Sequence, residues 1–133
     1  MRALKIVAIV LAIYAGIVII FESLLGYFQP ANEATLVIAT TDSSGQSNDR
    51  VLARLEHEGS VYVAANHWPR AWYRQALANP QVTATFGGET RPYTAVSLES
   101  SEHDAVDQAH SLGLVFRILT GFPPRYILRL DPR

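Results

Sequence analysis

Residues 81–98, QVTATFGGETRPYTAVSL, carry the pattern that decides the fold of this chain. Two runs rich in β-branched and aromatic residues, 81–86 and 90–98, flank Gly87-Gly88. Such runs are typical of strands, and a Gly-Gly pair supplies the backbone freedom that a two-residue hairpin turn needs. We therefore expect an antiparallel hairpin here, with the rest of the chain built around a β-sheet.

Four further strands are expected from runs of the same kind, at residues 35–41, 50–56, 60–65 and 125–130. Two short helices lie among them: 71–78, which Asn79-Pro80 ends, and 101–112, which Gly113 ends. The second helix shows an apolar face made of Ala105, Val106, Ala109 and Leu112. The short connections favour antiparallel pairing, so the predicted fold class is mainly β (α+β): a six-stranded barrel closed by its final strand.

The N-terminal part of the chain is a separate kind of segment. Residues 6–21, IVAIVLAIYAGIVIIF, carry no charge and as a helix would span roughly 24 Å. The run is apolar on every face and no A-x-A site follows it, which favours an uncleaved transmembrane helix over a cleaved signal peptide or a buried soluble helix. The predicted organisation is an anchor at residues 1–29, a linker at 30–34 and a barrel at 35–133.

Composition excludes several classes of function. The chain has 133 residues, no cysteine and a formal net charge of −1, so disulfides, zinc–thiolate sites and a nucleic-acid partner are not expected. His103, Asp107 and His110 have helical i, i+4, i+7 spacing, which suits either a metal or a solvated polar face. The polar face is the commoner outcome, and no metal site is predicted.

Residues 64–80, AANHWPRAWYRQALANP, combine two tryptophans, a tyrosine, a histidine and two arginines near a strand end. Aromatic planes and guanidinium groups in such a place suit a flat, anionic cofactor. The same aromatic side chains could instead plug one end of the barrel. The composition of the segment supports both interpretations equally.

This segment resembles the deazaflavin (F420)-dependent nitroreductase family of split β-barrel proteins, which are akin to the pyridoxamine-phosphate-oxidase-like flavin binders. The more specific match is AWY-x-x-x-L-ANP-x-V, with Trp72-Tyr73, Leu77, Ala78-Asn79-Pro80 and Val82. Looser matches are Thr40-Thr41, Ser44-Gly45, Arg50, the run 63–66 and Gly87-Gly88-Glu89. The resemblance implies a split barrel for residues 35–133.

The resemblance implies an oxidoreductase that transfers hydride from reduced F420, or alternatively from FMN, to a quinone or nitro-type acceptor. The apolar N-terminal run makes the predicted enzyme membrane-anchored. The resemblance assigns cofactor binding to Arg50, Asn66, His67, Trp72 and Tyr73, with the Trp72-Tyr73 pair at the cofactor ring or at the barrel support. Arg54, which departs from the family pattern, is a sixth predicted cofactor-binding residue. No catalytic residue is assigned. Split barrels of this kind often form homodimers.

Two differences from the family keep other interpretations open. His67 stands where the family commonly has a lysine, and the loop around it is shorter. A non-catalytic, membrane-tethered binding domain and a haem-binding barrel with His67 as ligand are the alternatives. The side of the membrane is also open: Arg2 and Lys5 before the apolar run favour an outward barrel, whereas F420 is made and reduced in the cytoplasm.

Overall fold

The computed structural model describes residues 1–27, 34–65, 71–122 and 124–133, with the side chains of 25–27 excepted. Contacts divide the chain into two compact units. We call Met1–Gln29 with Leu112–Pro123 the helical unit, and Pro30–Ser111 with Pro124–Arg133 the barrel unit.

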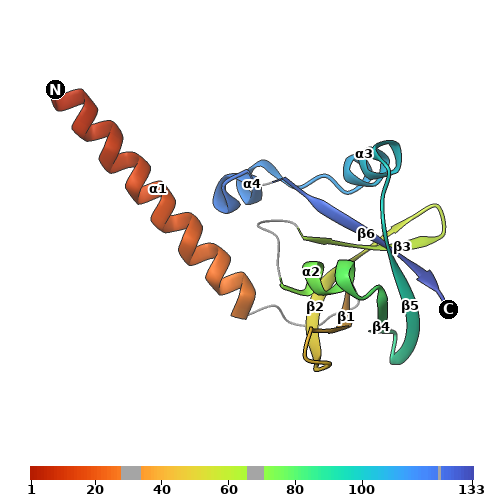
Figure 1. Cartoon of the computed structure of the whole chain (residues 1–133). Coiled ribbons are helices and arrows are strands. Elements are labelled where there is room, and N and C mark those ends of the chain that lie inside the picture. Colours follow the sequence, from red (N-terminus) through yellow and green to blue (C-terminus); the bar gives the residue numbers. More distant parts are fainter. Residues whose placement is uncertain (28–33, 66–70, 123) are drawn as a thin grey trace. The chain divides into compact units, whose positions relative to one another are not determined.

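The barrel unit is a closed barrel of six antiparallel strands in the order β1-β2-β3-β6-β5-β4 (Figure 1). The strands are β1 (Thr35–Thr41), β2 (Ser47–His57), β3 (Ser60–Ala65), β4 (Gln81–Phe86), β5 (Glu89–Ser97) and β6 (Tyr126–Pro132). The predicted fold class is confirmed. The final strand closes the barrel between β3 and β5, as expected.

Strict alternation of side chains forms the barrel core. In β1 the buried residues Leu36, Ile38 and Thr40 alternate with half-buried ones, which is the period of two that a strand imposes. Opposite and adjacent strands fill the interior with further apolar side chains: Leu52, Val63, Val82, Ala84, Tyr93, Leu128 and Leu130. Burying each of the larger side chains stabilises the fold by about 1.5–3 kcal/mol.

A second apolar cluster lies between the outside of the barrel and α3 (Ser100–Ala109), with Val106 fully buried at its centre. The prediction that Ala105, Val106, Ala109 and Leu112 form the apolar face of this helix is wrong in part. Ala105 and Ala109 are exposed, and the helix ends before Leu112. The reason is that polar side chains on either side of Val106 make the contacts with the barrel.

The three candidate metal ligands belong to that contact surface. His103 Nε2 lies 2.8 Å from the Arg125 carbonyl oxygen, and His110 Nε2 lies 2.8 Å from the Glu56 carbonyl oxygen. Asp107 accepts a 3.0 Å hydrogen bond from the Arg125 guanidinium. The side chains therefore bind the barrel and not a common centre, and the described residues contain no group suited to a metal ion.

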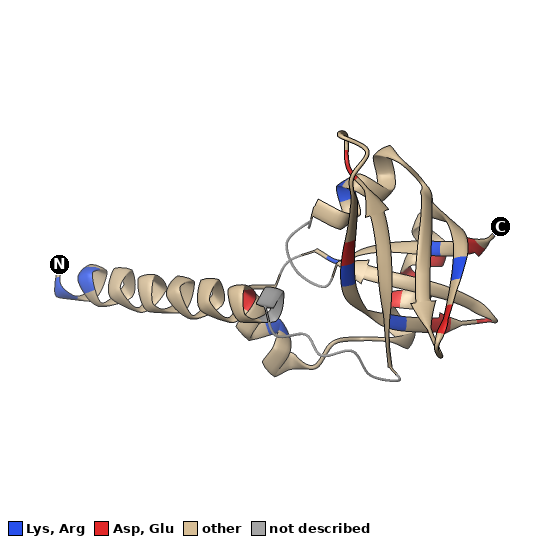
Figure 2. Cartoon of the chain, turned by 90° about the horizontal axis from the view of Figure 1, so that it is seen from below, with Lys and Arg blue, Asp and Glu red and all other residues tan. Residues whose placement is uncertain are grey.

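The helical unit consists of α1 (Arg2–Tyr27) and α4 (Leu114–Thr120). Within α1, the 23-residue stretch Arg2–Leu24 is long and apolar enough to cross a membrane, and its 18-residue apolar window has a mean hydropathy of 2.8 and contains no buried residue. A signal sequence would share these properties. Glu22, near the C-terminal end of the stretch, is buried. Figure 2 shows charge near the two ends of α1 and an uncharged stretch between them.

Candidate functional site

Two adjoining clefts lie along α2 (Ala71–Ala78), and both are lined by Ala71 and Gln75. The first has a volume of about 330 Å³ and the second about 440 Å³. The first cleft is further lined by Asn48, Asp49, Arg50 and Trp72. The second is further lined by Thr41, Asp42, Ser43, Arg74, Ala78 and Asn79. They form the candidate site of the barrel unit.

The helical period explains why α2 contributes to both the core and the clefts. Ala71, Arg74, Gln75 and Ala78, spaced i, i+3, i+4 and i+7, line the clefts. Trp72 and Ala76 are buried in the barrel core. One helical turn therefore places a cation and an amide beside the clefts while its other face fixes the helix to the barrel.

Gln75 is held in place from inside the barrel. The hydroxyl of Thr40, which is fully buried, donates a 2.7 Å hydrogen bond to the side-chain carbonyl oxygen Oε1 of Gln75. This contact leaves the amide NH₂ of Gln75 as the donor at the cleft wall. A residue of the strand core thus orients a polar group of the site.

The turn between β1 and β2 is ordered by Asp42. Its Oδ1 accepts hydrogen bonds from the backbone N–H of Ser44 (2.9 Å) and Gln46 (3.0 Å) and from the Ser44 hydroxyl (2.6 Å). Its Oδ2 accepts from the Asn48 amide at 3.2 Å. These bonds, led by those from Ser44 and Asn48, lower the pKa of Asp42 to about 2. The carboxylate therefore stays ionised at neutral pH and fixes Asn48 at the first cleft.

The charges of the clefts suit a ligand with anionic and polar groups. Arg50 is directly opposite Ile38, which is fully buried, so both point to the inner face of the barrel. Arg74 belongs to the second cleft. Guanidinium groups bind phosphate or carboxylate through two parallel hydrogen bonds. Asp49 lines the first cleft and Asp42 the second, so each cleft has one carboxylate and one guanidinium among its lining residues.

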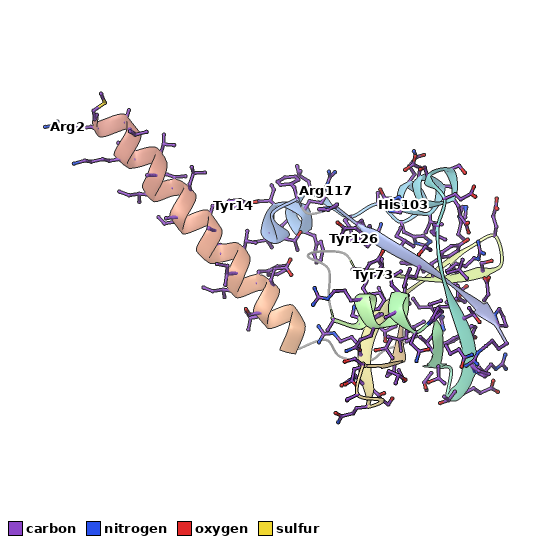
Figure 3. The ribbon with its side chains drawn as sticks, viewed as in Figure 1. Arg2, Tyr14, Tyr73, His103, Arg117 and Tyr126 are labelled. Atoms are coloured by element: carbon purple, nitrogen blue, oxygen red, sulfur yellow. The ribbon has the colours of Figure 1, made fainter. Side chains whose placement is uncertain are left out.

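Of the six residues predicted to bind a cofactor, Arg50 and Trp72 line the first cleft. Trp72 is only 4% exposed and packs in the barrel core. Tyr73 packs against that core, with its ring 5.8 Å from Trp72 and 5.4 Å from Tyr126 (Figure 3). Burial, and then the proximity of Tyr126, raise the pKa of Tyr73. The described contacts are those of a barrel support, and ring stacking by this pair stays a prediction.

The other three predicted residues lie elsewhere. Arg54 lies outside the lining of both clefts: its guanidinium carbon is 4.9 Å from the centre of the Phe86 ring and its Nε is 3.2 Å from Glu56. Asn66 and His67 fall outside the described residues. Cofactor binding by Arg54, Asn66 and His67 stays a prediction.

The prediction missed Asn48, Arg74 and Gln75. The signal for two of them was present, because Arg74 and Gln75 share one face of a helix whose bounds the sequence predicted. For Asn48 no such signal exists, since its place at the first cleft depends on the closure of the turn by Asp42.

Comparisons with known proteins show the family and the fold of this chain. A family model described as F420H(2)-dependent quinone reductase matches residues 19–111, more than half of the chain. No functionally curated protein matches. Among solved structures, an F420-H2 dependent reductase (FDR-A) has a TM-score of 0.60 at 22% identity, covering 78% of this chain and 99% of that one.

Two further structures share the fold. One, described as a domain-swapped dimer, has a TM-score of 0.63 at 20% identity and covers 77% of this chain and 84% of its own. The haem storage protein HutZ from Vibrio cholerae has a TM-score of 0.58 at 22% identity and covers 77% and 83%. These likenesses show the split-barrel fold, and the family model shows more: the chain belongs to the F420H(2)-dependent quinone reductase family.

Proposed function

We propose that this protein is a membrane-anchored oxidoreductase that binds reduced F420 in the clefts beside α2 and transfers hydride to a quinone or nitro-type acceptor. The observation that carries the proposal is the placement of Arg50, Arg74 and Gln75 at two adjoining clefts in a chain whose family uses F420H2.

The residues of the clefts fit an anionic cofactor. Arg50 and Arg74 would hold phosphate or carboxylate groups, and the amides of Asn48 and Gln75 would orient polar groups between them. Trp72 lines the first cleft and is otherwise buried, so it would offer the cofactor apolar surface. When bound, F420H2 would supply the hydride, while the protein supplies binding, orientation and electrostatics.

The proposed membrane anchor explains why a quinone would be the electron acceptor. The stretch Arg2–Leu24 can span a bilayer by length and composition, and a tethered barrel would stay beside the layer in which lipophilic quinones dissolve. A barrel on the cytoplasmic side would also have access to reduced F420. Because one structural relative is described as a dimer, we include a homodimer as the proposed assembly.

The test is a titration of the full-length protein, in detergent micelles, with F420 and separately with FMN. Quenching of cofactor fluorescence reports binding, and oxidation of F420H2 on adding a soluble quinone reports turnover. Replacing Arg50 by alanine removes charge-assisted hydrogen bonds of about 1.5–3 kcal/mol, which corresponds to roughly 10- to 150-fold weaker binding.

The matched control is Arg91→Ala. Arg91 is an exposed arginine on β5, paired with Glu89 and outside both clefts, so its removal should leave affinity unchanged. Equal losses in the two variants would show that net charge matters and the cleft does not. If neither F420 nor FMN binds at micromolar concentration, the enzyme proposal falls and a non-catalytic binding domain replaces it. A Soret band in the isolated protein would instead favour haem.

A further inference from the structure

The short helix α4 of the helical unit packs along one face of α1. The Tyr14 hydroxyl donates a 2.8 Å hydrogen bond to the Ile118 carbonyl oxygen (Figure 3). The rings of Phe21 and Phe116 meet edge to face at 5.9 Å. Tyr14 and Phe21 are seven residues apart, so both lie on one side of α1, in the C-terminal half of the candidate span Arg2–Leu24.

A glycine allows this close approach. Gly121, the C-cap of α4, has the left-handed backbone conformation with φ +81°. A Cβ at this position would lie 3.3 Å from Val18 Cγ1. Val18 lies between Tyr14 and Phe21 on the same face of α1, so the helix end and the glycine turn both follow the surface of the apolar helix.

The carbonyl groups of Phe116, Arg117 and Ile118 in α4 are hydrogen-bonded within the helical unit. The Thr120 hydroxyl donates to the Phe116 carbonyl oxygen at 2.9 Å, and the Phe122 N–H donates to that of Arg117 at 2.9 Å. The Ile118 carbonyl oxygen accepts from Tyr14 and from the Gly121 N–H. A helix end in contact with lipid needs such internal partners, because the hydrocarbon layer offers no water to bond to.

The opposite face of α4 is apolar and uncovered. The helical spacing i, i+1, i+4 places Leu114, Val115 and Ile118 along one stripe of α4. Phe122 follows the Gly121 turn and extends the apolar surface beyond the helix, and the four side chains are between 41% and 72% exposed. Arg117 stands beside this stripe, with its guanidinium carbon 5.5 Å from the centre of the Phe122 ring. A cation next to an apolar stripe is the pattern of a helix that lies in a membrane interface.

We infer that α4 inserts into the lipid leaflet alongside α1, so that the anchor is a pair of helices and not a single span. The inference rests on the proposed membrane anchorage of α1. Leu114, Val115, Ile118 and Phe122 contact acyl chains, and Arg117 reaches the headgroup phosphates. The contacts with Tyr14, Val18 and Phe21 are continuous with the lipid-facing surface of α1, which is why lipid is the occupant of the stripe.

The absence of cysteine from the chain makes single-cysteine labelling the test. Val115→Cys reports the α4 stripe, Ile13→Cys reports α1, and Gln108→Cys on exposed α3 is the aqueous control. Each full-length variant carries a nitrobenzoxadiazole label and is reconstituted into phosphatidylcholine–phosphatidylglycerol vesicles. Lipids with a quencher on the acyl chain, and iodide in the buffer, then report lipid and water contact.

The expected result is that labels at positions 13 and 115 have blue-shifted emission, lose fluorescence with the acyl-chain quencher and are protected from iodide. The label at 108 should behave in the opposite way. If 13 lies in lipid and 115 is quenched by iodide, the α4 inference is overturned and the anchor stands. If 115 is shielded from both quenchers, a second copy of the chain covers the stripe and the inference is also overturned. If 13 itself is in water, the anchorage has failed.

Discussion

Glu102 of α3 gives the sharpest test of how the outer helix is held to the barrel. Its carboxylate accepts hydrogen bonds from Arg129 Nη1 at 2.7 and 2.8 Å, and from the Tyr62 hydroxyl at 2.8 Å. Replacing Glu102 by glutamine keeps the shape, removes the charge and turns an NH₂ toward the guanidinium. The hydrogen bonds from Arg129 and then from Tyr62 lower the pKa of Glu102.

The magnitude follows from the exposure of the pair. The side chains of Arg129 and Glu102 are 27% and 30% exposed. Fully exposed pairs contribute about 0.2–1 kcal/mol, and breaking a buried pair costs about 3–5 kcal/mol. In the variant, Arg129 also keeps its ion pair with Asp131, whose Oδ1 lies 2.6 Å from Arg129 Nε. We expect Glu102→Gln to lower the free energy of unfolding by about 1.5–2 kcal/mol at pH 7, or Tm by roughly 6–15 °C.

The stabilisation by Glu102 should depend on pH in a defined direction. A carboxyl whose pKa is lowered by folding stabilises the protein above its ordinary pKa of 4.5, and that contribution is lost as the pH falls through the lowered value. The difference between wild type and Glu102→Gln should therefore shrink from pH 7 toward pH 3. Thermal unfolding of the full-length protein in detergent micelles, followed by tryptophan fluorescence, measures it.

The control for that experiment is Glu99→Gln. Glu99 precedes the same helix, is exposed and makes no side-chain capping hydrogen bond, so this variant loses the same charge at the same helix end. Its free energy of unfolding should lie within about 0.5 kcal/mol of that of the wild type. A Glu102→Gln protein that is as stable as Glu99→Gln at pH 7, or a difference that persists unchanged at pH 3, would refute the reasoning.

Two other predictions concern the clefts. Thr40→Val keeps the buried volume but removes the hydrogen bond to Gln75. We expect this variant to lose about 1 kcal/mol in stability and to bind F420 more weakly. Thr40→Ser retains the hydroxyl and should bind F420 as the wild type does. Asp42→Ala should raise the amide exchange rate of Gln46 at neutral pH. In the wild type, the pKa of Asp42 is lowered to about 2. The protection of the Gln46 amide from exchange should therefore be present above pH 4 and be lost as the pH falls toward 2. An unchanged exchange rate in the variant would refute the role of the carboxylate.

Much of the barrel was predictable because local signals and tertiary contacts agree. The bounds of β1, β3, α2 and β4 match the prediction, since a turn-forming Gly, Asn, Asp or Pro marks at least one end of each. β2 was predicted too short because the stretch DSSGQSN reads as one loop. Asp42 closes the turn by Gln46, so the strand begins at Ser47.

The face of α3 was not predictable from hydropathy. The prediction assumed that apolar residues would face the barrel, and Ala105 and Ala109 were assigned accordingly. The outer barrel wall instead offers Arg125, Arg129 and carbonyl oxygens, and polar residues of α3 bind them. A single sequence does not say which polar groups a sheet presents at a given place, so contacts of this kind appear only once the register of the strands is known.

The proposed α4 insertion also bears on the side of the membrane. The outward bias rests on Arg2 and Lys5 before the span, because Arg50 is the first cation after it in the sequence. The structure adds a cation that sequence order does not show, since α4 brings Arg117 to the C-terminal half of the span. C-terminal charges can reverse a topology that a weak N-terminal bias would set. Arg117 therefore reduces the excess of cations before the span from two to one and weakens the bias against a cytoplasmic barrel, which is the side on which the proposed reaction finds its hydride donor.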